Sequence, residues 1–213
     1  MKLIVMLTHN DKTVPNAREI FAACKDTCTQ DWGFKNVGVE KEVLIELAKD
    51  IHAAGKTAYM EVVTYSEEEC LEAAQTAIDC GVDYLLGTVY YPSVLEKIRN
   101  TDLKFFPFCG KVRNSPSVLG KTPDDVIADA KMFKDLGIDG TDLLLYRFEG
   151  DQQELMDRYF SEVDLPTIVA GSINSHERIS LMHKLNVWGY TIGGAFFTGD
   201  FVPGGDFRDN LLD

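Results

Sequence analysis

Glu61 and Lys35, a carboxylate and an ammonium group, are the residues of this chain best placed to do chemistry. Glu61 interrupts the apolar run YMEVV, and a charge inside such a run is costly unless it is paired or used. If Met60 and Val62 face covering helices, Glu61 points the opposite way, toward Lys35 in the preceding apolar segment. This pair can serve as a base and as the cation that stabilises an enolate-like charge. A structural ion pair, or a Glu61 that faces outward, are the alternatives that the sequence leaves open.

Two short glycine-containing segments, AGS and IGGA, each end an apolar run near the end of the chain. Glycine turns let main-chain N–H groups approach an anion without a Cβ in the way. The alternative is that these glycines only permit tight turns. Because both segments follow apolar runs in the same manner, we expect them to bind one phosphate or similar anion together. The residues expected to hold it are Gly171, Ser172, Gly193 and Gly194.

Further polar residues follow other apolar runs and extend the predicted site. His9 follows the first run and is a candidate acid–base residue. Arg147 and Lys111 are candidates to grip the far end of an anionic substrate, since a guanidinium offers a fork for a carboxylate. Asn36, beside Lys35, is a third candidate for substrate binding. Solvation at the rim is the alternative for Lys111.

No motif in the chain demands a metal or a redox cofactor. Glu61 with His9 or Asp11 has the oxygen-rich character that suits a divalent cation such as Mg²⁺. The five cysteines are odd in number, and no pair of Cys or His residues follows at zinc spacing. We therefore expect reduced thiols and no required metal, with Mg²⁺ left open.

Eight short apolar runs, each followed by a helical segment, must position these residues. Strict alternation of this kind is typical of a parallel sheet wrapped by helices. Eight such units in 213 residues leave little room for insertions and predict one domain, residues 1–213. The fold class is α/β, a (β/α)8 TIM barrel of aldolase type. A doubly wound open sheet is the alternative, but its glycine-rich loop is missing from THNDKT after the first run. The predicted strands are 3–7, 32–39, 57–63, 83–89, 104–110, 142–148, 166–172 and 190–197.

The charge of the chain limits its partners. Lys and Arg number 21 against 34 Asp and Glu, which gives a net charge of −13. Such acidity argues against binding to nucleic acid or to anionic lipid. No apolar run approaches the roughly 20 residues that span a bilayer, and the opening MKLIVMLTHND turns polar too early for a signal peptide. We expect a cytoplasmic protein, and aromatic pairs such as Phe196–Phe197 leave a homodimer open.

The segments PTIVAGSI and WGYTIGGAFF resemble the C-terminal quarter of the phosphate-binding (β/α)8 superfamily. That group includes N-acetylmannosamine-6-phosphate 2-epimerase, ribulose-phosphate epimerases and decarboxylases, and the glycerol uptake operon antiterminator. The joints AAGKTAYMEV and CGVDYLLGT are similar to those of the antiterminator-type barrels. The whole chain also resembles small barrels labelled 4-hydroxythreonine-4-phosphate dehydrogenase, although the histidine metal ligands of that activity are not apparent. The resemblance implies an anion site after the last two strands and an acidic site residue at Glu61.

These observations predict an enzyme of carbohydrate metabolism, an isomerase or a lyase. Its expected substrate is a small phosphorylated, sugar-like metabolite, and the expected reaction is epimerisation, aldol cleavage or decarboxylation through an enolate-type intermediate. One alternative is a regulator of the antiterminator type that binds a phosphorylated metabolite and RNA, which the acidic net charge disfavours. Another is a barrel without a reaction that serves only in assembly.

Overall fold

The chain folds around a closed barrel of eight parallel strands, in which β12 pairs with β1. The computed structural model describes residues 1–213. This architecture confirms the predicted (β/α)8 barrel, and the open-sheet alternative is wrong. In order around the barrel, the strands are β1 (Lys2–Met6), β4 (Asp31–Lys35), β5 (Thr57–Val62), β6 (Tyr84–Val89), β7 (Lys104–Phe108), β10 (Thr141–Leu143), β11 (Thr167–Val169) and β12 (Gly189–Ile192).

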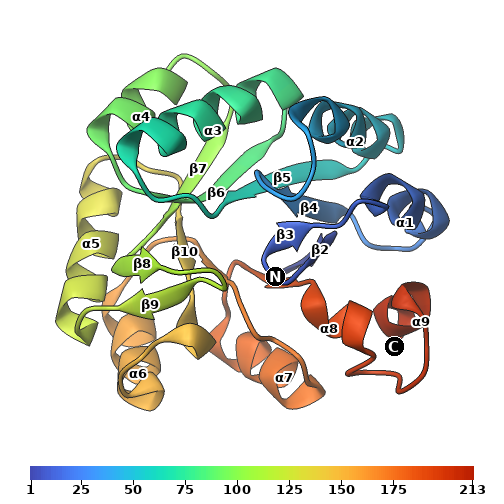
Figure 1. Ribbon diagram of the computed structural model, residues 1–213. Helices are drawn as coiled ribbons and strands as arrows, with labels where there is room; N and C mark the ends of the chain where they lie inside the picture. The colour runs from blue at the N-terminus through green and yellow to red at the C-terminus, as the bar shows by residue number, and fades with distance from the viewer.

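Helices follow the barrel strands and cover the outside of the barrel (Figure 1). Several begin where the sequence provides capping groups: a capping box joins Ser66 and Glu69 at the start of α3, and Pro123 follows the N-cap Thr122 of α5. None has the length and apolar character needed to cross a membrane. The helices are α1 (Ala17–Cys24), α2 (Lys41–Ala53), α3 (Glu67–Cys80), α4 (Pro92–Ile98), α5 (Pro123–Asp135), α6 (Gln152–Glu162), α7 (His176–Leu185), α8 (Gly194–Thr198) and α9 (Phe207–Leu212).

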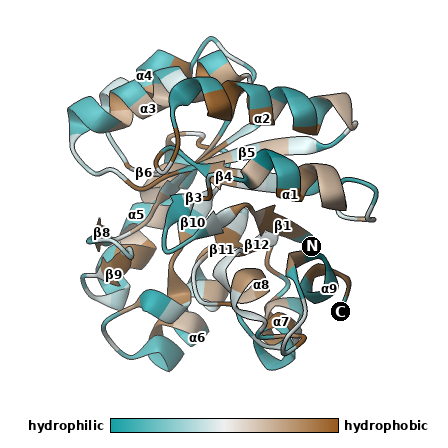
Figure 2. Ribbon diagram, turned by 45° about the vertical axis from the view of Figure 1, so that its right-hand side comes forward, coloured by the Kyte–Doolittle hydropathy of each residue, from teal (hydrophilic) through white to brown (hydrophobic).

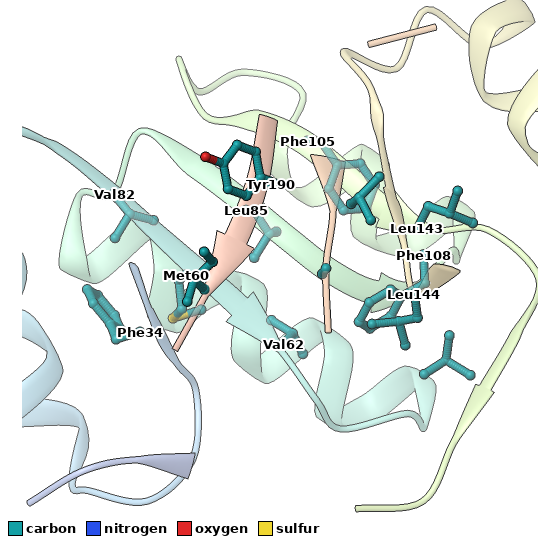
Figure 3. Close-up of a cluster of buried hydrophobic side chains, with 14 of the residues drawn as sticks. Phe34, Met60, Val62, Val82, Leu85, Phe105, Phe108, Leu143, Leu144 and Tyr190 are labelled. Carbon is teal, nitrogen blue, oxygen red and sulfur yellow. The ribbon is translucent and has the colours of Figure 1, made fainter. Parts of the chain in front are cut away.

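Apolar side chains pack on both faces of the barrel wall. Outward-facing residues such as Met60 and Leu85 pack beneath the helices (Figure 3), whose hydrophilic residues face away from the barrel (Figure 2). Because both strand faces are buried, the strands read as continuous apolar runs. The barrel interior holds a smaller apolar cluster, formed by Ile4, Met6, Tyr59, Leu86, Phe106 and Ile168.

Two β-hairpins extend the loops at the carboxyl end of the barrel (Figure 1). The first consists of β2 (Thr8–His9) and β3 (Lys12–Thr13), and the second of β8 (Lys111–Arg113) and β9 (Val118–Gly120). The turn of the first hairpin is Asn10–Asp11, with φ of 50° and 57°, as a two-residue hairpin turn requires. The hydroxyl of Thr13 bonds both the N–H and the carbonyl of Lys35, at 2.8 Å each, which fixes this hairpin to β4.

Three predicted strands end four or five residues earlier than their apolar runs suggest. The strand predicted at 32–39 ends at Lys35, and the one predicted at 142–148 ends at Leu143, before the 3-10 helix η1 (Leu145–Arg147). The run 190–197 is a strand only to Ile192, after which α8 begins. An apolar run does not by itself distinguish a strand from a buried helix, and here the helical parts also contain buried residues: Leu145, Ala195 and Phe196.

Candidate functional site

A cavity of about 290 Å³ opens at the carboxyl end of the barrel. It lies among the ends of β1, β4, β5, β11 and β12, the turn of the first hairpin and η1. Only 4 of its 20 lining residues are hydrophobic. This polarity and size suit a small, charged ligand better than an apolar one.

Lys35 and Glu61 meet inside this cavity as neighbours on adjacent strands. The register of β4 on β5 places the two residues opposite each other, and both side chains point into the barrel. Lys35 Nζ lies 3.3 Å from Glu61 Oε1, and the side chains are only 6% and 4% exposed. The contact that the sequence predicts is present, and the alternative with Glu61 facing outward is wrong.

Asp11 forms a second carboxylate contact with Lys35. Its Oδ1 accepts a hydrogen bond from Lys35 Nζ at 2.9 Å, and Arg147 Nη1 donates to both of its oxygens, at 3.1 and 2.9 Å. The main-chain N–H of Ser117, in the second hairpin, donates to Oδ2 at 2.7 Å. Burial alone raises the pKa of Asp11, but the charges of Lys35 and Arg147 lower it well below its ordinary value. Asp11 is therefore a permanent anion at the mouth of the barrel.

Lys35 is held as an ammonium ion. Burial lowers the pKa of this amine, but attraction to Glu61 and Asp11 outweighs burial and raises the pKa above its ordinary value. A protonated amine cannot attack a carbonyl as a nucleophile. Lys35 is suited instead to stabilise negative charge that develops on a substrate oxygen.

Asp142, the middle residue of β10, is a buried acid that sequence reasoning missed. It is fully buried, and neither carboxyl oxygen has a hydrogen-bond partner. Burial raises the pKa of Asp142 well above its ordinary value, and repulsion from Glu61 raises it further; attraction to Lys35 and Arg147 offsets this only in part. The buried Asp142 carboxyl group therefore favours its protonated form. The signal was present in the sequence, as a carboxylate directly before the apolar run LLL.

The turn after β11 provides unused hydrogen-bond donors. Gly171 and Ser172 both have left-handed backbone conformations, with φ of 81° and 59°. A Cβ at Gly171 would lie 2.8 Å from Nε of Arg147, so glycine lets the guanidinium lie against this turn. That Nε also contacts Ser172 Oγ at 3.4 Å. The N–H groups of residues 171–173 make no hydrogen bond to a main-chain carbonyl, and all three residues line the cavity.

The turn after β12 faces the same cavity. Gly193 lies so close to β2 that a Cβ would come within 2.9 Å of the Thr8 carbonyl oxygen, and its N–H also makes no main-chain hydrogen bond. A Cβ at Gly194 would meet only His9 Nδ1, at 3.9 Å. That ring nitrogen is buried and has no hydrogen-bond partner. His9 therefore lies beside the glycine turn, and its acid–base role stays a prediction.

Lys111 and Asn36, two predicted substrate-binding residues, lie outside the cavity. Lys111 is exposed on β8, where the second hairpin carries it away from the barrel mouth. The side chain of Asn36 accepts a hydrogen bond from the N–H of Val63 at 3.0 Å and donates to Thr64 Oγ1 at 3.2 Å. It thus joins the loops that follow β4 and β5. The third predicted binder, Arg147, does line the cavity, and it lies on the side of the glycine turns.

The carboxylates do not form the Mg²⁺ site that the sequence left open. The ammonium group of Lys35 contacts both Asp11 and Glu61, the position that a bound cation would take between them. No group of three or more His, Cys, Asp or Glu side chains in the structure is arranged to hold a metal ion. The donor set therefore fits a lysine rather than a divalent cation.

Comparison with known proteins identifies the fold. No protein-family model matches the chain, and no curated protein matches it by sequence. The N-acetylmannosamine-6-phosphate 2-epimerase from Clostridium perfringens has a similar structure, with a TM-score of 0.65 at 12% identity over 91% of this chain and 86% of that chain. A monomeric form of the phosphoribosylanthranilate isomerase from Thermotoga maritima gives 0.67 at 10% identity, over 99% and 94%.

A third similar structure is the thiamine phosphate pyrophosphorylase from Pyrococcus furiosus, with a TM-score of 0.61 at 13% identity over 98% of this chain and 91% of that chain. At such low identity these likenesses establish the architecture and not the activity. The chain has the (β/α)8 barrel fold that these enzymes share.

Proposed function

We propose that this chain is an enzyme that acts on a small phosphorylated, sugar-like metabolite. The observation that carries the proposal is a single cavity that contains both the two glycine turns and the buried Lys35–Glu61 pair. In barrels of this fold the active site lies at the carboxyl end of the strands, and phosphate commonly binds at the loops after the seventh and eighth. The three similar enzymes are each named for a phosphorylated compound, which supports the same substrate class.

The phosphate is held by the glycine turns. Main-chain N–H groups of Gly171, Ser172, Ile173 and Gly193 line the cavity and have no main-chain acceptor, so they are free to donate to an anion. The guanidinium of Arg147 adds a positive charge against the first turn. Charge-assisted bonds of this kind are roughly twice as strong as neutral ones. The turns therefore offer a doubly charged phosphate both donors and a counter-charge.

The reacting carbons face Lys35 and Glu61 at the other side of the cavity. The Glu61 carboxylate takes a proton from a carbon next to a carbonyl group, and the C–H electron pair moves toward the carbonyl oxygen as an enolate. Lys35 stabilises that oxygen, which is the place where negative charge develops. Phosphate binding supplies orientation from a distance. Epimerisation, aldol cleavage and decarboxylation all pass through this kind of intermediate.

A search for turnover with phosphorylated sugars, followed by one substitution, tests this proposal. Once a substrate is found, Glu61→Gln should lower kcat by about 10²- to 10⁴-fold, since it removes the base and keeps the shape of the side chain. Lys111→Gln is the matched control, because Lys111 is exposed outside the cavity and should keep full activity. A Glu61→Gln protein with undiminished turnover would remove Glu61 from the mechanism.

A further inference from the structure

An unbroken series of polar contacts joins the phosphate turn to the Lys35–Glu61 pair. Ser172 Oγ lies 3.4 Å from Arg147 Nε, and Arg147 Nη1 lies 2.9 Å from Asp11 Oδ2. Asp11 Oδ1 lies 2.9 Å from Lys35 Nζ, which is 3.3 Å from Glu61 Oε1. Asp11 is the middle member of this series. Asp11 contacts neither the glycine turns nor Glu61 directly. It bonds the two cations that do: Arg147, which contacts the first turn, and Lys35, which contacts Glu61.

Asp11 also balances the charge of the cluster. Lys35 and Arg147 carry two positive charges, and Glu61 supplies only one negative charge, because Asp142 holds its proton. The second negative charge is that of Asp11, whose side chain is only 4% exposed. A buried cation without a counter-charge is strongly destabilising. Asp11 therefore supplies to Lys35 and Arg147 the negative charge that a bound anion could also supply.

We propose that Asp11 is a positioning residue that holds Lys35 against Glu61, and that substrate phosphate competes with it for Arg147. This inference rests on the proposed function and adds an electrostatic coupling between its two halves. Phosphate bound at the turn attracts Arg147 away from Asp11, so Lys35 becomes the main cation paired with Asp11. Phosphate binding at one side of the cavity therefore strengthens the attraction between Asp11 and the Lys35 ammonium group at the other side.

The substitution Asp11→Asn separates this role from a structural one. The proposal predicts that phosphate affinity rises while the pKa of Lys35 falls. The amide keeps an oxygen for the Ser117 N–H but leaves the cluster with one excess positive charge. Inorganic phosphate should then bind about threefold to tenfold more tightly, while the pKa of Lys35 should fall because one of its two counter-charges is gone. Loss of a purely structural contact would loosen the turns and weaken phosphate binding.

Calorimetric titration with inorganic phosphate and NMR titration of the Lys35 Cε–H signals measure these two effects. The groups that surround Lys35 and shape its titration are Glu61, Asp11, Arg147, Asp142 and Tyr65. Asp31→Asn is the control, since Asp31 holds Lys2 at 3.2 Å at the opposite end of the barrel. It should leave both phosphate affinity and the pKa of Lys35 unchanged.

A measurement on the unaltered protein covers the case in which Asp11→Asn does not fold. Saturating phosphate should raise the pKa of Lys35 in the wild-type chain, and an unchanged pKa despite bound phosphate would overturn the coupling. Weaker phosphate binding by a folded Asp11→Asn protein would overturn it as well. If phosphate binds neither protein, the proposed phosphate site fails, and the inference fails with it.

Discussion

The two ends of the barrel interior each hold a lysine bonded to an aspartate, but in opposite surroundings. At the amino end, Lys2 Nζ lies 3.2 Å from Asp31, whose Oδ1 also accepts a 2.7 Å hydrogen bond from Tyr59. The same ammonium group lies over the rings of Trp188 and Tyr84, at 4.7 and 5.3 Å from their centroids. The Lys2 side chain is 35% exposed, so its ammonium group retains part of its hydration, whereas Asp31 is 11% exposed. Aromatic rings and one partly hydrated ion pair close this end.

The carboxyl end buries far more charge than closure of a barrel requires. Lys35, Asp11 and Glu61 are all nearly inaccessible to solvent, and the carboxyl group of Asp142 is fully buried near them. Burial of charge costs several kcal/mol per ion before any pairing is counted. Since the amino end shows how the same fold closes without this cost, we infer that the buried charges serve binding and chemistry. Concentrations of perturbed titratable groups are typical of functional sites.

Removing one lysine at each end should give the largest difference between them. Lys35→Met leaves the buried Glu61 carboxylate without a cation, while Asp11 keeps its bond to Arg147. We expect a loss of about 3 to 5 kcal/mol in the free energy of unfolding. Lys2→Met removes a partly hydrated pair and should cost about 1 kcal/mol or less. Urea unfolding at pH 7 measures both. Equal losses at the two ends would contradict the distinction drawn here.

A double substitution sharpens the same comparison. Adding Glu61→Leu to Lys35→Met removes the carboxylate that the first change leaves unpaired. Apolar replacement of a buried ion pair is often neutral or favourable, so the double variant should be more stable than Lys35→Met alone. A further loss of stability would mean that Glu61 is needed for the fold itself.

Asp142→Asn should make the protein more stable, by a smaller change in the free energy of unfolding than Lys35→Met causes. Burial raises the pKa of Asp142 in the folded state, so the folded chain holds a proton that the unfolded chain releases above about pH 4. The folded state then binds more protons than the unfolded state, and stability falls as pH rises. The amide is never charged and avoids this penalty, so the gain in the free energy of unfolding should be present at pH 7 and absent at low pH.

The pH dependence of that gain provides the check. Unfolding curves from pH 3 to pH 8 should show no advantage for Asp142→Asn at the acid end and a growing advantage above about pH 4. Asp31→Asn, at the amino end, should instead lower stability because it gives up the ion pair with Lys2. A loss of stability by Asp142→Asn at every pH would show that the carboxyl group has a partner it needs.

The sequence predicted the barrel and one contact of the site, for physical reasons that also explain its failures. Alternating apolar runs and helices define the fold, and alternation within neighbouring strands was enough to bring Lys35 to Glu61. Asp11 meets Ser117 and Arg147 across 106 and 136 residues. Contacts between loops at such separations depend on hairpin geometry, which no local pattern encodes. Lys111 lies outside the cavity because it stands on the second hairpin, which the sequence did not predict.

Asp142 and the end of β12 show a different limit. A carboxylate at the edge of an apolar run is typical of a strand end, so Asp142 did not stand out as Glu61 did in the middle of its run. The apolar residues after Ile192 continue without a break into α8, where Phe196 packs against Phe207. The apolar run therefore predicted that these residues are buried, but it did not show whether they form a strand or a helix.

The most direct test of the account compares two glycine substitutions on the same segment of chain. A methyl group at Gly194 enters the cavity and meets only His9 Nδ1 at 3.9 Å, whereas one at Gly189, at the opposite end of β12, makes ordinary contacts from 3.4 Å outward. Neither should change stability by more than about 0.5 kcal/mol. Titration with inorganic phosphate should show binding to the wild-type and Gly189→Ala proteins, and at least about tenfold weaker binding to Gly194→Ala. Equal phosphate affinity in all three proteins, or none in any, would contradict a phosphate site at these turns.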